Sequence, residues 1–369
     1  MTFVLLRTAL RLLWGTLAMA AAVAGAQAAD YALTTITDNL DKPWSVVQLP
    51  DNSFLVAQRG GELLRVAQDG STAEISGVPS TYVAGQGGFF DVVLHPEFAA
   101  NQMIYLSYAH GTPAANGTAI TRGRLEGNVL ADAEQILLVK PFKGTPQHYG
   151  GKMLFLGDGT LLVSTGDGFD YREQAQDLGS ELGKVLRIND DGTLPGDNPF
   201  SAGSSERIWS YGHRNPQGLV VDSEGTVYLH EHGPRGGDEI NILEPGKNYG
   251  WPAITHGVNY SGARVSPFTA ADGMEQPLVY WVPSIAPSGM AWYDGDAFPG
   301  WRGDLFVGTL VDMDVRRIDL DQGRVVAQEV LFSELEERIR DVRSGRDGYL
   351  YLLTDGEAAR LIRVSPKTP

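Results

Sequence analysis

The sequence predicts an all-β fold, a six-bladed β-propeller with four-stranded antiparallel blades. One strand–turn–strand pattern occurs six times along the 369 residues, and self-similarity of this kind is the signature of a repeat architecture. Long runs of apolar residues at helical spacing are missing, apart from one turn near residues 333–339. The 45 glycines and 20 prolines also suit a chain with many turns.

Each copy of the pattern has a polar turn, an alternating apolar strand, a small polar or glycine-rich turn, and a second strand that ends in a basic residue. The six copies cover residues 51–66, 101–125, 157–189, 224–243, 303–320 and 347–364. Each is expected to form a hairpin, and each period is long enough for a four-stranded blade. Further β-like runs, at 44–49 and 87–96, supply additional strands. A β-sandwich is disfavoured because six similar units are more than it requires.

The two longest insertions, 167–207 and 250–284, are predicted to be loops over one face of the propeller. Function is expected on that face, because binding and catalytic residues concentrate on loops held by a rigid scaffold. No linker divides the chain, so residues 29–369 are predicted to be a single domain.

The N-terminus has the pattern of a cleaved signal peptide, residues 1–28. Arg7 and Arg11 precede an apolar run at 12–25, and Ala26-Gln27-Ala28 provides small residues for cleavage. The apolar run is shorter than the ~20 residues of a membrane-spanning helix. We therefore expect export to the periplasm without stable membrane insertion.

The composition narrows the choice of partners. The chain has no cysteine and a net charge of -16, so its stability must come from a core or from bound metal. Such an acidic chain would repel nucleic acid and anionic membrane surfaces. Neutral small molecules and cations remain as partners, and the chain is expected to be a monomer or a homodimer.

Four polar clusters interrupt the strands where an ordinary β-protein would have glycine or serine. They are residues 85–88 (GQGG), 147–151 (QHYGG), 211–218 (YGHRNPQG) and 230–239, where HEHGP leads to Asp238-Glu239. His148 attracts attention because a neutral imidazole is a natural base near neutral pH. Taken alone it would more often be structural, and Arg214 and Asn215 would equally suit a salt bridge and a turn cap.

Together with NYGWP from Asn248, APSG from Ala286 and RIRDV from Arg338, these clusters resemble one family in their order and spacing. It is the soluble quinoprotein sugar dehydrogenases that use pyrroloquinoline quinone (PQQ), namely soluble glucose dehydrogenase and the aldose sugar dehydrogenases. The resemblance covers nearly the whole mature chain. It implies that His148 is the general base that takes the proton of the sugar's anomeric hydroxyl. It also implies that Arg214 stabilises negative charge and, with Asn215, contacts the cofactor.

The resemblance further implies calcium. Backbone carbonyls are common ligands of hard cations, and those of Gly233 and Pro234 match the carbonyls that hold the calcium at the quinone. Glu239 and the carbonyl of Tyr249 match a second, structural calcium site. A zinc site at His230 and His232 is disfavoured because no third ligand follows at a familiar spacing.

Arg338 and Arg340 lie two residues apart, so both side chains can face the same way and bind the carboxylates of PQQ. The alternative is an exposed basic edge that follows an acidic segment. Gln86 matches a glutamine of the family that contacts the sugar or the cofactor rim, and Gln147 and Trp281 are assigned to the sugar. One position departs from the family pattern: a lysine that contacts the cofactor is replaced by Val311.

These features predict a periplasmic enzyme that oxidises the C1 hydroxyl of aldose sugars to lactones, with PQQ, calcium and an unidentified electron acceptor. No GxGxxG segment follows a strand and opens a helix, which argues against a nicotinamide cofactor. One alternative is a calcium-dependent propeller lactonase. Another is a sugar- or partner-binding propeller without catalysis, for which Val311 is the best evidence.

Overall fold

The computed structural model describes residues 31–200 and 205–367. The predicted signal peptide, residues 1–28, lies outside the described residues, and the domain limits 29–369 stay a prediction. In the described part of the chain no helix combines the length and apolarity needed to cross a membrane.

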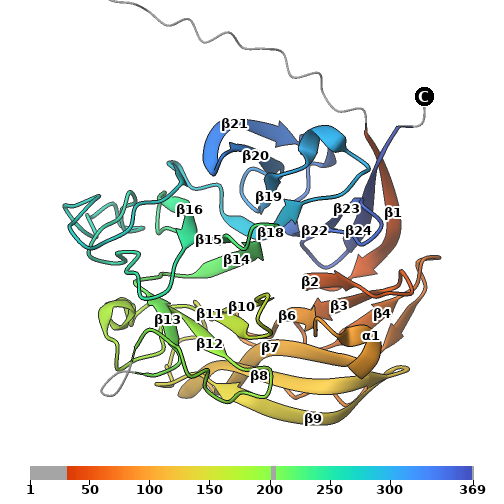
Figure 1. The fold of residues 1–369 in the computed structure, drawn as a ribbon, viewed down its shortest axis with the longest axis horizontal. Coiled ribbons are helices and arrows are strands. Elements are labelled where there is room, and N and C mark those ends of the chain that lie inside the picture. Colours follow the sequence, from red (N-terminus) through yellow and green to blue (C-terminus); the bar gives the residue numbers. More distant parts are fainter. Residues whose placement is uncertain (1–30, 201–204, 368–369) are drawn as a thin grey trace, which may run out of the picture. The chain divides into compact units, whose positions relative to one another are not determined.

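The described residues form six antiparallel sheets of four strands each, arranged in a ring (Figure 1). The predicted six-bladed β-propeller is therefore confirmed. The innermost strands of neighbouring sheets contact each other around the ring. In each blade the first strand lines the channel and the fourth is the outermost.

The first two blades are β2 (Pro43–Gln48), β3 (Phe54–Gln58), β4 (Leu63–Val66), β5 (Thr72–Glu74), and β6 (Phe89–Leu94), β7 (Met103–Thr112), β8 (Ala115–Glu126), β9 (Val129–Leu138). The next two are β10 (Gly150–Phe155), β11 (Leu161–Thr165), β12 (Lys184–Ile188), β13 (Ile208–Tyr211), and β14 (Pro216–Val221), β15 (Val227–Glu231), β16 (Asp238–Leu243), β17 (Val279–Trp281). The last two are β18 (Pro287–Tyr293), β19 (Asp304–Thr309), β20 (Val315–Asp321), β21 (Arg324–Leu331), and β22 (Ile339–Ser344), β23 (Leu350–Thr354), β24 (Ala359–Pro366), β1 (Tyr31–Leu40).

The six predicted hairpins form the second and third strands of the six blades. The additional runs at 44–49 and 87–96 correspond to the innermost strands β2 and β6. The last blade is closed by β1, which pairs with β24 from Tyr31 opposite Pro366 to Leu40 opposite Ala359. Because this pairing joins the two ends of the described chain, it closes the ring.

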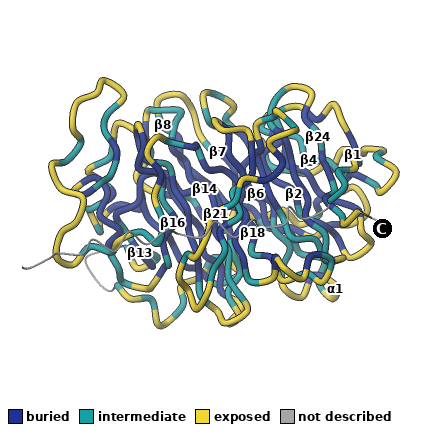
Figure 2. The backbone as a smooth tube through the Cα atoms, turned by 90° about the horizontal axis from the view of Figure 1, so that it is seen from above, coloured by how far each residue is buried: buried dark blue, intermediate teal, exposed yellow. Residues whose placement is uncertain are grey.

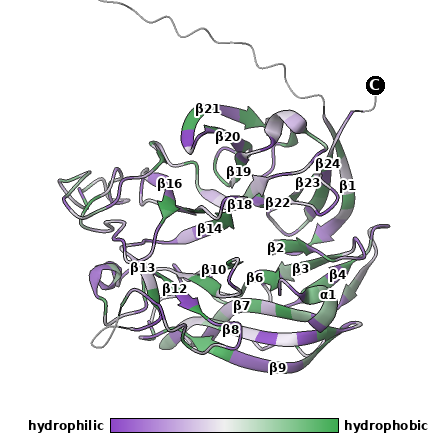
Figure 3. Ribbon diagram, viewed as in Figure 1, coloured by the Kyte–Doolittle hydropathy of each residue, from purple (hydrophilic) through white to green (hydrophobic). Residues whose placement is uncertain are grey.

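The hydrophobic core lies between blades. Leu55 and Ala57 of β3, for example, pack in one cluster with Leu106 of β7. A blade with two apolar faces must stack on a neighbour on each side to remove those faces from water. The strands are accordingly buried and the connecting loops exposed (Figure 2). The outer strand β9 mixes hydrophilic and hydrophobic residues (Figure 3).

The few helical segments are short: α1 (Phe98–Asn101), η1 (Arg172–Gln176), η2 (Pro299–Trp301) and η3 (Ser333–Leu335). The last of them coincides with the helical turn expected near residues 333–339.

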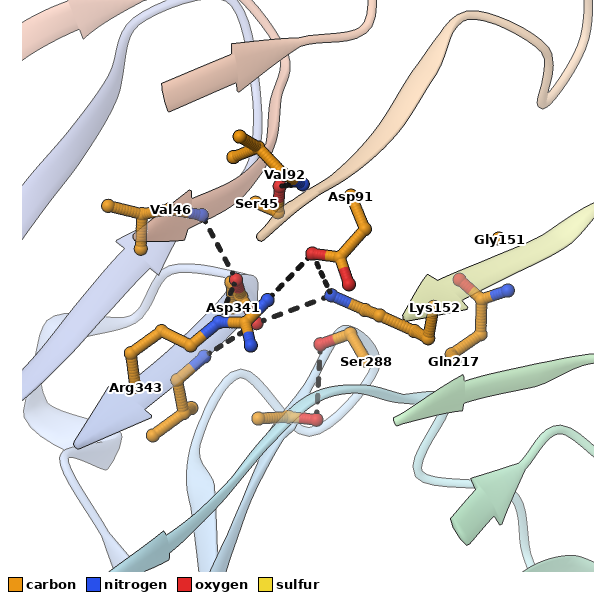
Figure 4. A network of polar contacts seen from close by, with 12 residues as sticks. Ser45, Val46, Asp91, Val92, Gly151, Lys152, Gln217, Ser288, Asp341 and Arg343 are labelled. Carbon is orange, nitrogen blue, oxygen red and sulfur yellow. Dashed lines mark hydrogen bonds and ion pairs between the residues drawn. The ribbon is translucent and has the colours of Figure 1, made fainter. Parts of the chain in front are cut away.

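Charged residues of the innermost strands meet at the centre of the ring (Figure 4). The guanidinium of Arg343 donates to Asp341 Oδ2 and to Asp91 Oδ1, at 2.8 Å each. Lys152 Nζ lies 3.7 Å from Asp91 Oδ1 and 3.6 Å from Asp341 Oδ1. Two cations and two carboxylates from β6, β10 and β22 thus balance each other in a buried position and hold these strands together.

The insertion predicted at 167–207 does not form a loop over one face. It contains the strand β12. Lys184, at the start of β12, follows residues 166–183, whereas Ile188, at its end, pairs with Leu161 at the other end of the blade. Residues 189–200 and 205–207 therefore lie at the opposite end from 166–183. The prediction was wrong here because the insertion was counted across the second strand of the predicted hairpin at 157–189, and this strand separates two loops at opposite ends of the blade.

Candidate active site

The polar clusters of the sequence converge at one end of the channel, and sheet pairing explains why. The first residue of β10, Gly150, pairs with the last of β11, Thr165. Pro216 at the start of β14 pairs with Glu231 at the end of β15. The turns before β10 and β14 and the loops after β11 and β15 consequently lie at the same end of their sheets.

His148 stands just before β10 and is 4% exposed. Its Nδ1 lies 2.7 Å from Asp167 Oδ1, and its backbone N–H donates to Gln86 Oε1 at 2.8 Å. Burial lowers the pKa of His148, as does the charge of Arg214, while the hydrogen bond to Asp167 opposes the shift. His148 is therefore neutral near pH 7.

Asp167 determines which ring nitrogen of His148 is free. Burial would raise its pKa, but the hydrogen bond and charge of His148 and the charge of Arg214 hold the pKa below its usual value. An ionised carboxylate only accepts hydrogen bonds, so Nδ1 of His148 carries the proton and Nε2 is left as a base. No described residue bonds to Nε2.

The sequence reasoning did not single out Asp167. Its Oδ1 also accepts the backbone N–H of Phe169 at 2.8 Å, and its Oδ2 accepts the indole N–H of Trp251 at 2.8 Å. The sequence signal for Asp167 lies in the third predicted hairpin, where Gly166-Asp167 follows the apolar run LLVST. A carboxylate at the end of a strand, at the edge where the other clusters lie, is a mark of a site.

Lys143 is a second residue that the sequence did not reveal. It is fully buried, and its Nζ donates to Asn116 Oδ1 at 3.0 Å and to the carbonyl of Thr145 at 2.6 Å. Burial lowers its pKa to about 7. Its charge also contributes to the lowered pKa of His148.

Arg214 supplies a positive charge close to His148. It is buried, and its Nη1 donates to the carbonyls of His232, at 3.1 Å, and Gly233, at 2.7 Å. The guanidinium carbon lies 5.4 Å from the ring centre of Trp251. Throughout residues 31–200 and 205–367 no carboxylate forms an ion pair with Arg214, so its charge is available to a ligand.

Asn215 and Gln86 contact the backbone beside His148. Asn215 Oδ1 accepts the backbone N–H of Gly150 at 3.3 Å and the side-chain amide of Gln217 at 3.3 Å. Since Gln86 Oε1 holds His148, the NH₂ group of Gln86 is the part that can face a ligand.

Arg338 and Arg340 point to the same carboxylate, as their spacing predicts. Arg338 Nε donates to Asp355 Oδ2 at 2.8 Å, and Arg340 donates to Asp355 Oδ1 from Nε at 3.1 Å and from Nη2 at 3.0 Å. Arg340 is buried and stacks 4.3 Å from the ring centre of Trp44. Two guanidinium groups share one carboxylate, which leaves a net positive charge.

The Val311 position lies next to this pair. Arg338 Nη1 donates to the carbonyl of Leu310 at 3.0 Å, and Val311 is 54% exposed. Two cations thus lie near this position, Arg338 through Leu310 and Arg316 through its ion pair with Asp312.

The segment 233–237 is a tight backbone cradle. A Cβ at Gly233 would lie 2.2 Å from the carbonyl oxygen of Gly236, and a Cβ at Gly257 would lie 2.1 Å from the same atom. Only glycine allows peptide groups to pack this closely. The described residues contain no cluster of three or more acidic or histidine side chains suited to a metal, so a calcium ion here would depend on the carbonyls of Gly233 and Pro234.

Glu239 and Glu231 lie directly opposite each other on β16 and β15. Burial and the charge of Glu231 raise the pKa of Glu239 to about 8. Tyr249 stacks on His213 with 4.8 Å between ring centres, and His213 Nδ1 lies 2.8 Å from Glu231 Oε1. Two neighbouring carboxyl groups are oxygen donors that fit calcium.

Residues 40–363 match the model of the family described as Glucose / Sorbosone dehydrogenase. The chain belongs to this family. The predicted family, and with it the prediction of a sugar dehydrogenase, is confirmed.

Individual members of the family support the assignment. The chain is 44% identical over 342 residues to aldose sugar dehydrogenase YliI of Escherichia coli (strain K12), covering 90% of this chain and 92% of that protein. The crystal structure of the soluble aldose sugar dehydrogenase (Asd) from E. coli in the apo-form superimposes with a TM-score of 0.88 and 43% identity, covering 91% of this chain and all of that one. The PQQ-bound aldose sugar dehydrogenase (Adh) from Streptomyces coelicolor has a TM-score of 0.73 and 26% identity, covering 91% of this chain and 99% of that one.

The residues of this family member fit an anionic quinone. PQQ is a tricarboxylate, and the channel end carries the unpaired charge of Arg214 and the partly compensated charges of Arg338 and Arg340. The carbonyl cradle at Gly233 adjoins Arg214 through their hydrogen bond. The same end of the channel thus has cations that can bind the quinone carboxylates, and it has backbone carbonyls that can bind a metal ion.

Gln147 and Trp281 are the other two residues assigned to the sugar. Gln147 precedes His148 and is partly exposed. Trp281 is 9% exposed in a hydrophobic cluster with Ile240 and Leu305, and its indole N–H donates to Gln328 at 3.0 Å. The structure does not bring Trp281 to His148, and the aromatic ring that contacts His148 is Phe169.

Proposed function

We propose that this chain is an aldose sugar dehydrogenase that oxidises the C1 hydroxyl of a sugar to a lactone, with PQQ and calcium at the channel end. The observation that carries the proposal is the hydrogen bond between His148 Nδ1 and Asp167, with Nε2 open and the unpaired charge of Arg214 nearby.

The chain's own groups position and deprotonate the sugar. Nε2 of His148 takes the proton of the C1 hydroxyl, and Asp167 stabilises the imidazolium that forms. Arg214 stabilises the negative charge that develops on the C1 oxygen, and the amide NH₂ of Gln86 binds a sugar hydroxyl. Bound PQQ supplies the two-electron acceptor, and calcium supplies the Lewis acid that polarises it.

The other assigned residues, apart from Gln147 and Trp281, have these places in the proposal. Arg338 and Arg340 bind quinone carboxylates with Asn215 nearby, Gly233 and Pro234 hold the catalytic calcium, and Glu239 and Tyr249 hold the structural one. The proposal includes export to the periplasm and a separate electron acceptor.

A non-catalytic sugar-binding propeller is the second candidate, and the exposed Val311 favours it. Losing the family lysine removes a cation from an anion site, which weakens cofactor binding by about 1–3 kcal/mol. Titration of the protein with PQQ and calcium, followed by turnover of aldoses with an artificial acceptor, separates the two candidates. Saturable quinone binding with sugar-dependent reduction is expected, and absence of quinone binding would leave the non-catalytic function.

The decisive variant is His148→Gln, which keeps the hydrogen-bonding capacity but cannot take the proton. Turnover is expected to fall by about 10²–10⁴ while quinone affinity stays close to that of the wild type. His95→Gln is the matched control, because His95 follows β6 at its other end. A fully loaded His148→Gln enzyme with wild-type turnover would remove His148 from the mechanism.

A further inference from the structure

The loop 143–149, which carries His148, is closed at its base by one amide oxygen. Asn116 Oδ1 in β8 accepts the ammonium of Lys143 at 3.0 Å and the hydroxyl of Tyr149 at 2.7 Å. Lys143 and Asn116 also exchange two backbone hydrogen bonds of 2.9 Å. Both ends of the loop are thus fixed to one strand. Between them, His148 is held at a φ of 49°, in the left-handed region that few non-glycine residues adopt.

Lys143 lies in this closure as a cation without a counter-ion. It is 1% exposed, its Nζ also donates to the carbonyl of Thr145 at 2.6 Å, and it lies 3.4 Å from the ring centre of Tyr149. Within residues 31–200 and 205–367 no carboxylate forms an ion pair with this ammonium. Burial of an unpaired ammonium is costly, and a neutral amide could donate to the same acceptors without that cost. The hydrogen bonds alone therefore do not explain why this side chain is a cation.

The side chain of Lys143 packs against the loop that holds the base. A Cβ at Gly168 would lie 2.7 Å from Lys143 Cδ, and the hydroxyl of Thr145 donates to the carbonyl of Gly168 at 2.6 Å. The backbone N–H of Gly168 donates to the carbonyl of His148 at 3.3 Å, and the preceding residue, Asp167, holds His148 Nδ1. The ammonium and the imidazole therefore lie on either side of the same short segment, 167–168.

The charged and titratable groups that face His148 are Asp167, Arg214, Lys143 and His232. Burial lowers the pKa of His232 well below its usual value, so this ring is neutral. The groups that face Lys143 are Asp167 and the phenol of Tyr149, whose pKa is raised by burial and which is therefore neutral as well. Since burial lowers the pKa of Lys143 to about 7, Lys143 is mostly charged at the pH values below 6.5 at which His148 takes up a proton.

We propose that Lys143 is a positioning residue for the base: it closes the loop on Asn116, and its uncompensated charge keeps His148 unprotonated and able to take the proton of the C1 hydroxyl. The inference rests on the proposed function, in which His148 is that base. The same charge helps the imidazolium to return its proton to water after each turnover, because a nearby cation disfavours a second one.

Two substitutions remove the unpaired charge in different ways. Lys143→Met deletes the ammonium, whereas Asn116→Asp keeps the lysine and the loop closure and gives the ammonium a carboxylate partner. Each is expected to raise the pKa of His148, because the field of an unpaired cation is lost. In the calcium- and quinone-loaded enzyme the fall of kcat at low pH then moves to higher pH. At the pH where wild-type kcat is half-maximal, the variants are expected to be about two- to fivefold slower.

Lys184→Met is the matched control. Lys184 is also fully buried, and its Nζ donates to three backbone carbonyls at 2.7–3.0 Å. Burial lowers its pKa to about 7 as well, but the charges that face it are those of Asp177 and Glu181. Lys184→Met is expected to lower the melting temperature, as Lys143→Met does, and to leave the pH profile in place. A purely structural role of Lys143 would give the same result in both lysine variants and would overturn the proposal.

NMR titration of the imidazoles in protein free of metal and quinone separates this inference from the proposed function. The chain has seven histidines, and the signals that are missing from His148→Gln identify those of His148. A higher pKa of His148 in Lys143→Met and Asn116→Asp than in the wild type supports the coupling even if the loaded enzyme oxidises no sugar. An unchanged pKa in either folded variant refutes it, and a raised pKa with an unmoved kcat profile refutes a role in catalysis.

Discussion

Replacement of Asp167 by asparagine is the sharpest test of how the site is built. The carboxylate accepts three hydrogen bonds: Oδ1 from His148 Nδ1 and the N–H of Phe169, and Oδ2 from the indole of Trp251. An amide has one oxygen and one NH₂ group, so in either orientation its NH₂ group faces a donor. If the NH₂ group faces Trp251, the indole N–H has no acceptor. If it faces His148, Nδ1 must accept a hydrogen bond, so the ring proton moves to Nε2 and the base is lost.

The magnitude follows from these two orientations. A buried donor without a partner costs about 1–3 kcal/mol of folding stability. Loss of the correct tautomer removes general-base catalysis, which contributes about 10²–10⁴ in rate. The negative charge of Asp167 also opposes the lowering of the His148 pKa, so its removal lowers that pKa further. The wild-type rate falls as pH drops through a pKa below 6.5, and this fall moves to still lower pH in Asp167→Asn.

Steady-state kcat against pH, with quinone and calcium saturating, measures both effects. Quinone titration and the melting temperature show whether the variant is folded and loaded. Asp177→Asn is the matched control, because Asp177 is exposed in the same insertion and its side chain caps only the N–H of Gly179. If Asp167→Asn kept wild-type kcat and an unshifted pH profile, Asp167 would not position the base.

Three further predictions concern the metal, the quinone and the fold. Exhaustive chelation is expected to lower the melting temperature and abolish quinone binding, because a metal bound only to the native state stabilises it; an unchanged melting curve would contradict the calcium sites. Arg340→Ala is expected to weaken quinone affinity by about 10- to 100-fold in a fluorescence titration, whereas Arg363→Ala, on β24, leaves it unchanged; equal curves would disprove the carboxylate contact. Lys152→Met is expected to cost about 3–5 kcal/mol in urea unfolding, because it leaves the carboxylates of Asp91 and Asp341 with one cation. A cost within ~0.5 kcal/mol, typical of surface substitutions, would show that the charges at the channel centre are not coupled.

The sequence showed where the polar residues gather because they stand in short runs, and the resemblance to the family supplied their predicted roles. His148, Arg214 and Gly233 each lie in a polar cluster at a strand end, and strand order brings those ends together. Asp167 was missed because its role depends on contacts with His148 and Trp251, which come from two other loops. Trp281 shows the converse, because its sequence neighbourhood matched a sugar-binding position while its ring lies in the core between blades.

The sequence by itself determined the repeat. Turn residues and alternating apolar positions act over a few neighbouring residues, so six hairpins, their order and the polar clusters between them are legible along the chain. Only the tertiary structure decided how the ring closes, through β1 and β24, and how Asp91, Lys152, Asp341 and Arg343 balance at its centre. The physical reason is that these contacts join residues far apart in the chain, where no local pattern records which partner each will meet.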